Sequence, residues 1–176
     1  MIEDTLVLIK PDAFQRGLSG EIISRLERTG FTLKEMKLTK PSKELIEKHY
    51  PEDEEWLKSI GNKTIKTYEK YDLNIVDDIG TYDPLEVGKK IRKWLIQYVT
   101  SGPVIAMVVS GNHAVEMVRK LVGNTAPIFA ELGTIRGDYS IDSPDLADRE
   151  KRSIHNLVHA SGNIKEAKKE IALWFN

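Results

Sequence analysis

Short apolar runs alternate with longer amphipathic stretches along the chain, and the runs predict buried β-strands. The runs at residues 5–9 and 104–109 are continuous and rich in branched apolar residues, which is typical of buried strands. Residues 31–39 alternate between apolar and polar, and the phase of the alternation shifts near Glu35, which indicates a β-bulge. A fourth strand or strand fragment is predicted at residues 138–141.

Five amphipathic stretches predict helices, and capping residues or glycines mark where these helices begin or end. The predicted N-caps are Ser42, Asp83, Asn112 and Asn163, and the glycines expected to end helices are Gly30 and Gly123. Asp83 and Asn163 each precede a glutamate by three residues, which is the arrangement of a capping box. The last helix is expected to bury Ile164, Ala167, Ile171 and Phe175.

Three segments depart from this pattern. Residues 51–90 begin with an acidic run and continue with Trp56, Ile60, Thr64 and Tyr68 at helical spacing, which predicts an added helical segment. Residues 124–136 and 142–152 predict two loops.

Without the added segment, the predicted elements form two βαβ units in tandem. This order favours an α+β, ferredoxin-like fold over a doubly wound parallel sheet. We therefore expect one domain over residues 1–176, a sandwich with a four-stranded antiparallel sheet covered by helices on one face, plus a helical insertion.

Composition excludes several classes of function. Of the 176 residues, 40 % are hydrophobic and 30 % are charged, and the formal net charge of −1 gives no overall attraction to nucleic acid or to an anionic membrane. The absence of cysteine excludes disulfides, thiolate metal sites and cysteine nucleophiles, and it fits a reducing, cytoplasmic location. We expect no leader peptide and no transmembrane helix, because the N-terminal residues directly enter a strand pattern and no apolar run is long enough to span a membrane.

Candidate chemistry depends on polar residues at the ends of the predicted elements, because common phosphate-loop, dinucleotide, zinc-helix and nucleophile-elbow motifs are missing from the sequence. His159 follows a short apolar run and precedes a predicted helix, where it is either a nucleophile or a packed or capping residue. A polyphosphate site needs cations and neutral donors, and the candidates are Lys10, Arg119, Thr125, Arg136 and Asn156. Taken singly, Lys10 and Arg119 are better explained as solvated surface charges.

Eight short motifs lie in order along the chain and together carry a family resemblance. They are Leu8–Ala13, Glu27–Phe31, His49–Tyr50, Tyr98–Val104, Gly123–Pro127, Gly133–Asp138, Asn156–Ser161 and Glu170–Phe175. Each motif alone is weak, but all eight in this order resemble the nucleoside diphosphate kinases over most of the chain.

The resemblance implies a ferredoxin-like fold and transfer of the γ-phosphate of a nucleoside triphosphate, typically ATP, to a nucleoside diphosphate. The reaction in this family is ping-pong, and His159 matches the histidine that is phosphorylated. Glu170 is expected to accept a hydrogen bond from the Nδ1–H of that imidazole, with Ser161 and Lys10 completing the catalytic set. The matching nucleotide-contacting positions are Lys10, Tyr50, Arg119, Thr125, Arg136 and Asn156.

The resemblance also implies that Mg²⁺ arrives with the nucleotide, with no metal ligands from the protein itself. The expected partners are nucleoside triphosphates and diphosphates, and further copies of the chain, with a hexamer favoured over a tetramer. The Pro127 loop and the C-terminal end are the expected contact regions of this homo-oligomer.

The sequence departs from the family pattern in two residues and two segments. Gly162 stands where the family usually has an aspartate, and Ile91, with Trp94 nearby, falls where an aromatic residue usually stacks on the base. Extra residues lie at about 51–90 and at about 142–152. These departures leave open a catalytically weakened nucleotide-binding or regulatory homologue, whereas the near-neutral charge disfavours a nucleic-acid-binding domain.

Overall fold

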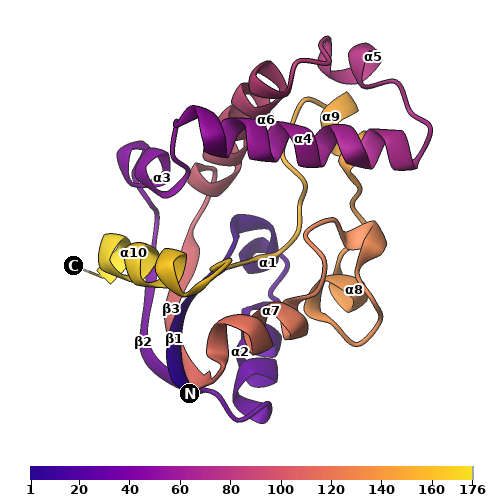
Figure 1. Cartoon of the computed structure of the whole chain (residues 1–176). Coiled ribbons are helices and arrows are strands. Elements are labelled where there is room, and N and C mark those ends of the chain that lie inside the picture. Colours follow the sequence, from indigo (N-terminus) through magenta and orange to yellow (C-terminus); the bar gives the residue numbers. More distant parts are fainter. Residues whose placement is uncertain (176) are drawn as a thin grey trace.

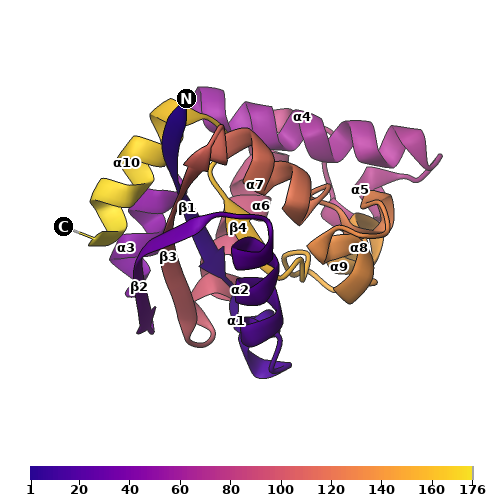
Figure 2. The same ribbon diagram turned by 90° about the horizontal axis from the view of Figure 1, so that it is seen from below.

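A single antiparallel sheet organises the chain. It consists of β1 (Ile2–Ile9), β2 (Thr32–Thr39), β3 (Val104–Asn112) and β4 (Val158–Ala160). In the computed structural model, which describes residues 1–175, these strands lie in the order β2-β3-β1-β4 (Figures 1 and 2). The register between β2 and β3 shifts between Leu33 and Glu35, so the predicted bulge is confirmed. The four-stranded antiparallel sheet and the α+β class are confirmed as well.

The fourth strand is not where the sequence predicts it. Residues 135–139 form α8 (Ile135–Tyr139), because the Thr134 hydroxyl accepts a hydrogen bond from Gly137 N at 3.1 Å and caps a helix there. The strand prediction for residues 138–141 is therefore wrong, and the fourth strand is β4, which carries His159. The two predicted loops contain helices too, namely η1 (Pro127–Phe129) and α9 (Pro144–Arg149).

Helices cover both faces of the sheet, so the prediction of a single covered face is wrong. Successive residues of a strand point to opposite faces, yet Leu6, Val7, Leu8 and Ile9 are all fully buried. Val7 and Ile9 pack with α2 (Ser19–Arg28) and α7 (Ala114–Val122). Leu6 and Leu8 pack with α3 (Lys43–His49), α6 (Pro84–Thr100) and α10 (Ile164–Phe175). Figure 2 shows α3 and α10 on one side of β1 and α2 on the other, next to the short α1 (Pro11–Gln15).

Most of the predicted helix ends are confirmed. The side chains of Ser42, Asp83 and Asn163 accept hydrogen bonds from backbone N–H groups three residues later. Asn112 is wrong as an N-cap because β3 continues to this residue, and α7 begins after His113. In α10, Ala167 and Glu170 are buried together with Trp174, and Ile164, predicted to be buried, is 45 % exposed.

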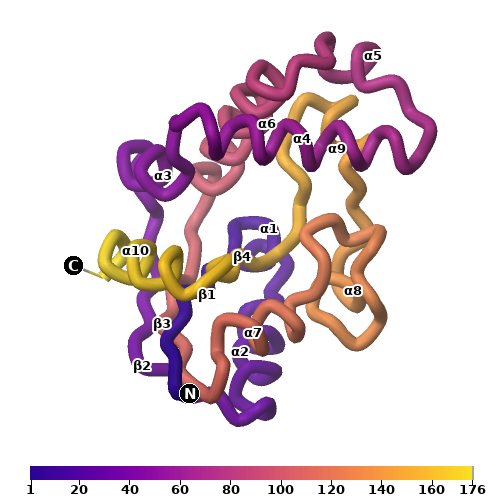
Figure 3. The backbone as a smooth tube through the Cα atoms, in the orientation of Figure 1, coloured from indigo at the N-terminus to yellow at the C-terminus, as the bar shows by residue number. Residues whose placement is uncertain are grey.

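A helical lobe stands beside the sheet and contains α4 (Glu54–Lys70), α5 (Ile75–Ile79), the first half of α6, and α9 (Figures 1 and 3). The lobe has a hydrophobic core of its own, formed by Ile65, Tyr68, Ile75, Ile79 and Val87. The helices α4 and α6 approach closely at two glycines. A Cβ on Gly61 would lie 1.9 Å from Pro84 O, and one on Gly88 would lie 2.1 Å from Leu57 O. In the part of the chain that is described, no helix combines the length and the apolar character needed to cross a membrane.

Candidate active site

His159 lies in the middle of β4, at the edge of the sheet, and its side chain is 18 % exposed. Its Nε2 atom lies 3.0 Å from Glu170 Oε2 and 3.1 Å from Glu170 Oε1. The expectation that Nδ1 faces Glu170 is therefore wrong, because the ring is turned the other way. Nδ1 has no hydrogen-bond partner among residues 1–175, so its lone pair is unoccupied.

Glu170 is held so that it accepts from both neighbouring side chains. The Ser161 hydroxyl donates to Glu170 Oε2 at 2.6 Å, and the same hydroxyl oxygen accepts from Leu6 N at 3.3 Å. Burial would raise the pKa of Glu170, but the neighbouring His159 ring and the Ser161 hydroxyl lower it to about 2. Glu170 is therefore a carboxylate at neutral pH, and this favours the His159 tautomer with the proton on Nε2.

The backbone turns sharply at Leu157, just before β4. Leu157 has φ +67° although it is fully buried, and Val158 N donates to Asn156 O at 2.7 Å across a three-residue turn. Such a backbone conformation raises the free energy of the folded state by about 1–3 kcal/mol in a non-glycine residue, so neighbouring hydrogen bonds must hold it in place. Asp12 Oδ2 accepts from Leu157 N at 3.2 Å, and Lys10 N donates to Leu157 O at 2.8 Å. Sequence reasoning missed Asp12, although it follows Lys10 by only two positions.

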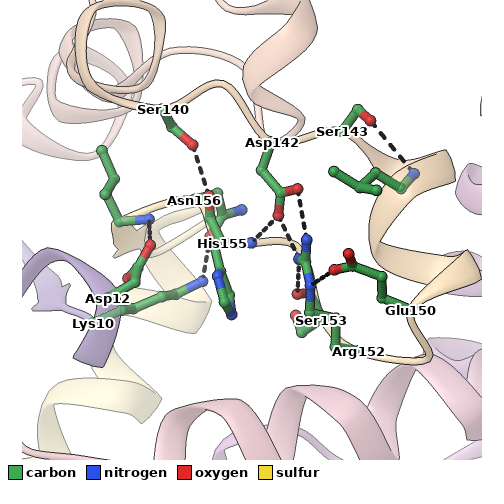
Figure 4. A network of polar contacts seen from close by, with 12 residues as sticks. Lys10, Asp12, Ser140, Asp142, Ser143, Glu150, Arg152, Ser153, His155 and Asn156 are labelled. Carbon is green, nitrogen blue, oxygen red and sulfur yellow. Dashed lines mark hydrogen bonds and ion pairs between the residues drawn. The ribbon is translucent and has the colours of Figure 1, made fainter.

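Lys10 and Asn156 form the buried polar centre of the site. Lys10 is 4 % exposed, and its Nζ donates to Asn156 Oδ1 at 2.6 Å (Figure 4). Asn156 Nδ2 donates to Thr125 O at 2.8 Å, which fixes the orientation of the amide. Burial and the nearby charge of Arg136 lower the pKa of Lys10 to about 7. The surface-charge interpretation is therefore wrong for Lys10.

The two arginines of the predicted site differ in their surroundings. Arg136 is 7 % exposed, and its guanidinium donates to the carbonyl oxygens of Asn156, Gly123 and Val158 at 3.0, 2.8 and 2.5 Å. It thereby holds the turn that precedes His159. Burial lowers the pKa of Arg136 to about 10, and the positive charge of Arg119 contributes to the shift. Arg119 is exposed on α7.

The aromatic side of the site lies next to the helical lobe. A cleft of about 190 Å³ beside His159 is lined in part by His49, Tyr50 and Trp56. Tyr50 follows α3 directly, is 7 % exposed, and accepts at its carbonyl oxygen from Arg92 Nε at 2.9 Å. Ile91 and Trp94 pack against the core of the lobe from α6.

An ion pair that the sequence does not predict, which we call the clasp, holds the segment before Asn156 in place (Figure 4). We define the clasp as Asp142, Arg152 and the backbone of His155. Arg152 Nη1 and Nη2 donate to the two oxygens of Asp142 at 2.6 and 3.0 Å, and His155 N donates to Asp142 Oδ2 at 2.7 Å. The Ser140 hydroxyl donates to His155 O at 2.7 Å. The clasp therefore fixes the residue directly before Asn156.

His49, His159 and Glu170 place possible metal-ligand atoms within 4.8 Å of one another. The lone pairs needed for a metal are nevertheless in use. Trp174 Nε1 donates to His49 Nδ1 at 3.2 Å, and His159 Nε2 contacts Glu170, to which only a protonated nitrogen can donate. The group is therefore a hydrogen-bonded network in this arrangement.

Comparison with known proteins decides the family. The family model described as nucleoside diphosphate kinase matches residues 3–70 and 81–176. The nucleoside diphosphate kinase of Pyrobaculum aerophilum is 55 % identical over 174 residues, which are 99 % of this chain and 95 % of that one. The chain belongs to the nucleoside diphosphate kinase family.

Other members of the nucleoside diphosphate kinase family agree with this assignment. The enzyme of Pyrococcus furiosus is 40 % identical over 99 % of this chain and 83 % of its own length. A crystal structure of the Pyrobaculum aerophilum kinase superimposes with a TM-score of 0.94 at 53 % identity, covering 100 % of this chain and 97 % of that one. A structure described as a transition-state mimic of the Borrelia burgdorferi nucleoside diphosphate kinase, with bound vanadate and ADP, has a TM-score of 0.77 at 33 % identity. The match covers 99 % of this chain and 88 % of that one.

The family match bears on the predicted insertions as well. It leaves out residues 71–80, which contain α5 and its connection to α4. The wider insertion at about 51–90 and the shorter one at about 142–152 stay predictions.

Proposed function

We propose that His159 carries the phosphoryl group when the chain acts as a nucleoside diphosphate kinase. In the first half-reaction, the lone pair of Nδ1 attacks the γ-phosphorus, and the bond to the bridging oxygen breaks so that the diphosphate leaves with the electron pair. In the second, a β-phosphate oxygen of another nucleoside diphosphate attacks the phosphorus, and Nδ1 recovers its electron pair. The observation that carries this proposal is the contact of Nε2 with Glu170, which leaves Nδ1 available.

Glu170 and Ser161 prepare the ring for this step. When Nδ1 forms its bond to phosphorus, the imidazole gains positive charge, and a carboxylate 3.0 Å from Nε2 stabilises that charge. The 2.6 Å hydrogen bond from Ser161 keeps the carboxylate in place, so Ser161 acts through Glu170.

The cationic and polar residues would bind the nucleotide in different ways. Lys10 is expected to neutralise charge on the transferred phosphoryl group, and Arg119 and Thr125 to contact the phosphates from the exposed side. Asn156 would reach the sugar hydroxyls, and Tyr50 would border the nucleotide next to the lobe. Arg136 donates to three backbone carbonyls, so we assign it the added role of holding the turn at Leu157.

Mg²⁺ fits a role on the nucleotide more readily than a site on the protein. The carboxylate nearest to His159 belongs to Glu170 and is already engaged by His159 and Ser161. The cations Lys10, Arg119 and Arg136 bind phosphate oxygens and repel a metal ion. Asn156 Oδ1, an oxygen that could otherwise ligate Mg²⁺, already accepts from Lys10. Bound to the phosphates, Mg²⁺ would neutralise their charge and fix their geometry.

The alternative of a weakened homologue depends mainly on Gly162. The backbone N–H of Gly162 donates to Glu166 Oε2 at 2.9 Å, so a carboxylate lies beside this position although the family aspartate is missing. Together with the intact contacts of Lys10, His159 and Glu170, this observation favours an active enzyme.

Labelling with [γ-³²P]ATP tests the proposal directly. We expect the chain to take up acid-labile, base-stable label and to lose it when GDP is added. His159→Ala should take up no label, whereas His113→Asn, a change at an exposed histidine outside the site, should label like the wild type. No label on the wild type, or equal label on His159→Ala, would exclude a phosphohistidine at this position.

We also keep the proposal of a homo-oligomer, with a hexamer favoured. The outer strand β2 leaves Met36 and Leu38 exposed by 55 % and 61 %, and such a strand edge favours pairing with a second copy. Analytical ultracentrifugation that finds only monomer would exclude the proposal.

A further inference from the structure

A second histidine lies against the nucleophile and takes no part in the steps above. His49 is the last residue of α3, and its side chain is only 1 % exposed. Its ring meets the His159 ring edge to face, with the centroids 4.6 Å apart and the planes at 76°. A buried histidine at this distance from a reacting imidazole needs an explanation.

The protonation state of His49 follows from its neighbour Trp174. An indole N–H can only donate, and Trp174 Nε1 donates to His49 Nδ1 at 3.2 Å. His49 Nδ1 must therefore be unprotonated, and the ring is neutral with its proton on Nε2. Burial, the nearby His159, Lys10 and Lys169 lower the pKa of His49 to about 3 against the opposing effect of Glu170. His49 consequently stays neutral at physiological pH.

A neutral His49 leaves Glu170 to the nucleophile. His49 Nδ1 lies 3.8 Å from Glu170 Oε1, close enough for an ion pair if His49 carried a charge. Because it is neutral, the strong interactions of the carboxylate are those with His159 Nε2 and Ser161. The edge-to-face contact, with the ring centroids 4.6 Å apart, also opposes a rotation of the His159 ring that would exchange Nδ1 with Nε2.

We propose that His49 is a positioning residue, whose neutral ring, held by Trp174, fixes the plane and the tautomer of His159 so that Nδ1 stays available for phosphoryl transfer. The inference rests on the proposed role of His159 as the nucleophile. A histidine meets both demands of the position, since it accepts from the indole at one atom and presents a flat ring to His159.

Two substitutions separate the ring from the hydrogen bond. His49→Asn keeps an acceptor near the position of Nδ1 but removes the ring, whereas His49→Phe keeps the ring and removes the acceptor. We expect His49→Asn to slow phosphoenzyme formation by about tenfold or more, since small misplacements of reacting groups cost up to about a hundredfold. The KM for the nucleotide should change less than about twofold, because His49 is assigned no nucleotide contact, and His49→Phe should restore most of the rate.

The tautomer of His159 provides a readout that needs no nucleotide. In ¹⁵N NMR spectra at pH 8, we expect the wild type and His49→Phe to show His159 protonated on Nε2, and His49→Asn to show a mixture of tautomers. If both variants fold, keep the wild-type tautomer and lose only thermal stability, His49 has a purely structural role and the proposal fails. Failure of His159 to be phosphorylated would overturn the proposed function instead, and the NMR result would still decide whether His49 orients the ring.

Discussion

The close approach of α4 and α6 makes a prediction that opposes the usual effect of a glycine-to-alanine change. In an exposed helix, replacing Gly by Ala stabilises by about 0.5–1 kcal/mol. A Cβ on Gly88 would lie 2.1 Å from Leu57 O, where ordinary contacts begin at 3.4 Å. The neighbouring atom is a backbone carbonyl oxygen, so the helices themselves must move apart by more than an ångström.

The cost of that movement should exceed the gain in helix propensity. Overpacking of a tight contact costs about 1–3 kcal/mol, and a backbone contact belongs at the upper end of this range. Gly88→Ala should therefore destabilise the chain by about 1–2 kcal/mol after the gain is subtracted, or about 2–8 °C in Tm for a chain of this size. Because Ile91 and Trp94 pack on the same helix, we also expect the KM for nucleotides to rise.

Gly20 in α2 provides the matched control. A Cβ on Gly20 would meet nothing within 4 Å, so Gly20→Ala should leave Tm unchanged or raise it. Thermal unfolding of both variants, with hydrogen exchange of α4 and α6, measures the difference. If Gly88→Ala is as stable as Gly20→Ala, with unchanged exchange in both helices, the reasoning about the helix crossing is wrong.

Four further predictions concern the polar network. Arg152→Gln leaves the buried Asp142 with one donor fewer and no counter-charge, so chemical denaturation should show a loss of about 2–4 kcal/mol. Glu150→Gln, which removes only an exposed partner of the same guanidinium, should lower the free energy of unfolding by less than about 1 kcal/mol. Equal losses in the two variants would show that the Arg152–Asp142 pair does not stabilise the fold in the way we describe. At pH 8 the wild type should take up a proton when a nucleotide binds, because the phosphate groups raise the pKa of Lys10 from about 7. Calorimetry in two buffers with different enthalpies of ionisation should detect this proton uptake in the wild type and not in Lys10→Met. In the absence of nucleotide, unfolded Lys10 keeps its proton up to about pH 10.4 while folded Lys10 releases it above about 7, so its contribution makes stability rise with pH between these values. Glu170→Gln should slow phosphoenzyme formation by about 10–100-fold in rapid-quench experiments, since a charge-assisted hydrogen bond contributes about 1.5–3 kcal/mol, and a wild-type rate would exclude the assigned role.

Patterns of a few neighbouring residues predict many of the strands and helix ends of this fold. The predictions that fail concern elements whose position depends on contacts with distant parts of the chain. The apolar runs of β1 and β3 and the caps at Ser42 and Asp83 are encoded within a few residues, so the sequence suffices for them. β4 has only three residues, too few for a recognisable period, and its pairing with β1 comes from distant sequence. The apolar run of β1 was a sign of burial on both faces, and the prediction of one covered face overlooked it.

In the candidate site, too, the sequence predicts which residues take part but not the contacts that orient them. The family resemblance identifies His159 and Glu170, but the nitrogen that faces the carboxylate depends on a side-chain rotation that sequence does not encode. The clasp of Asp142 and Arg152 spans ten positions in a polar stretch, and nothing in that spacing distinguishes it from a surface ion pair. The importance of His49 emerges only when Trp174 and His159 are seen on either side of it.

The central position of β1 has a consequence for how the chain is made. Lys10 and Asn156 are 146 positions apart, so a ribosome adding about 5–20 residues per second needs about 7–30 s to produce the second after the first. During that interval β1 has one edge without β4, and the nascent polypeptide exposes a strand meant to be covered on every side. The rate of synthesis therefore sets how long this edge of β1 stays without its partner strand.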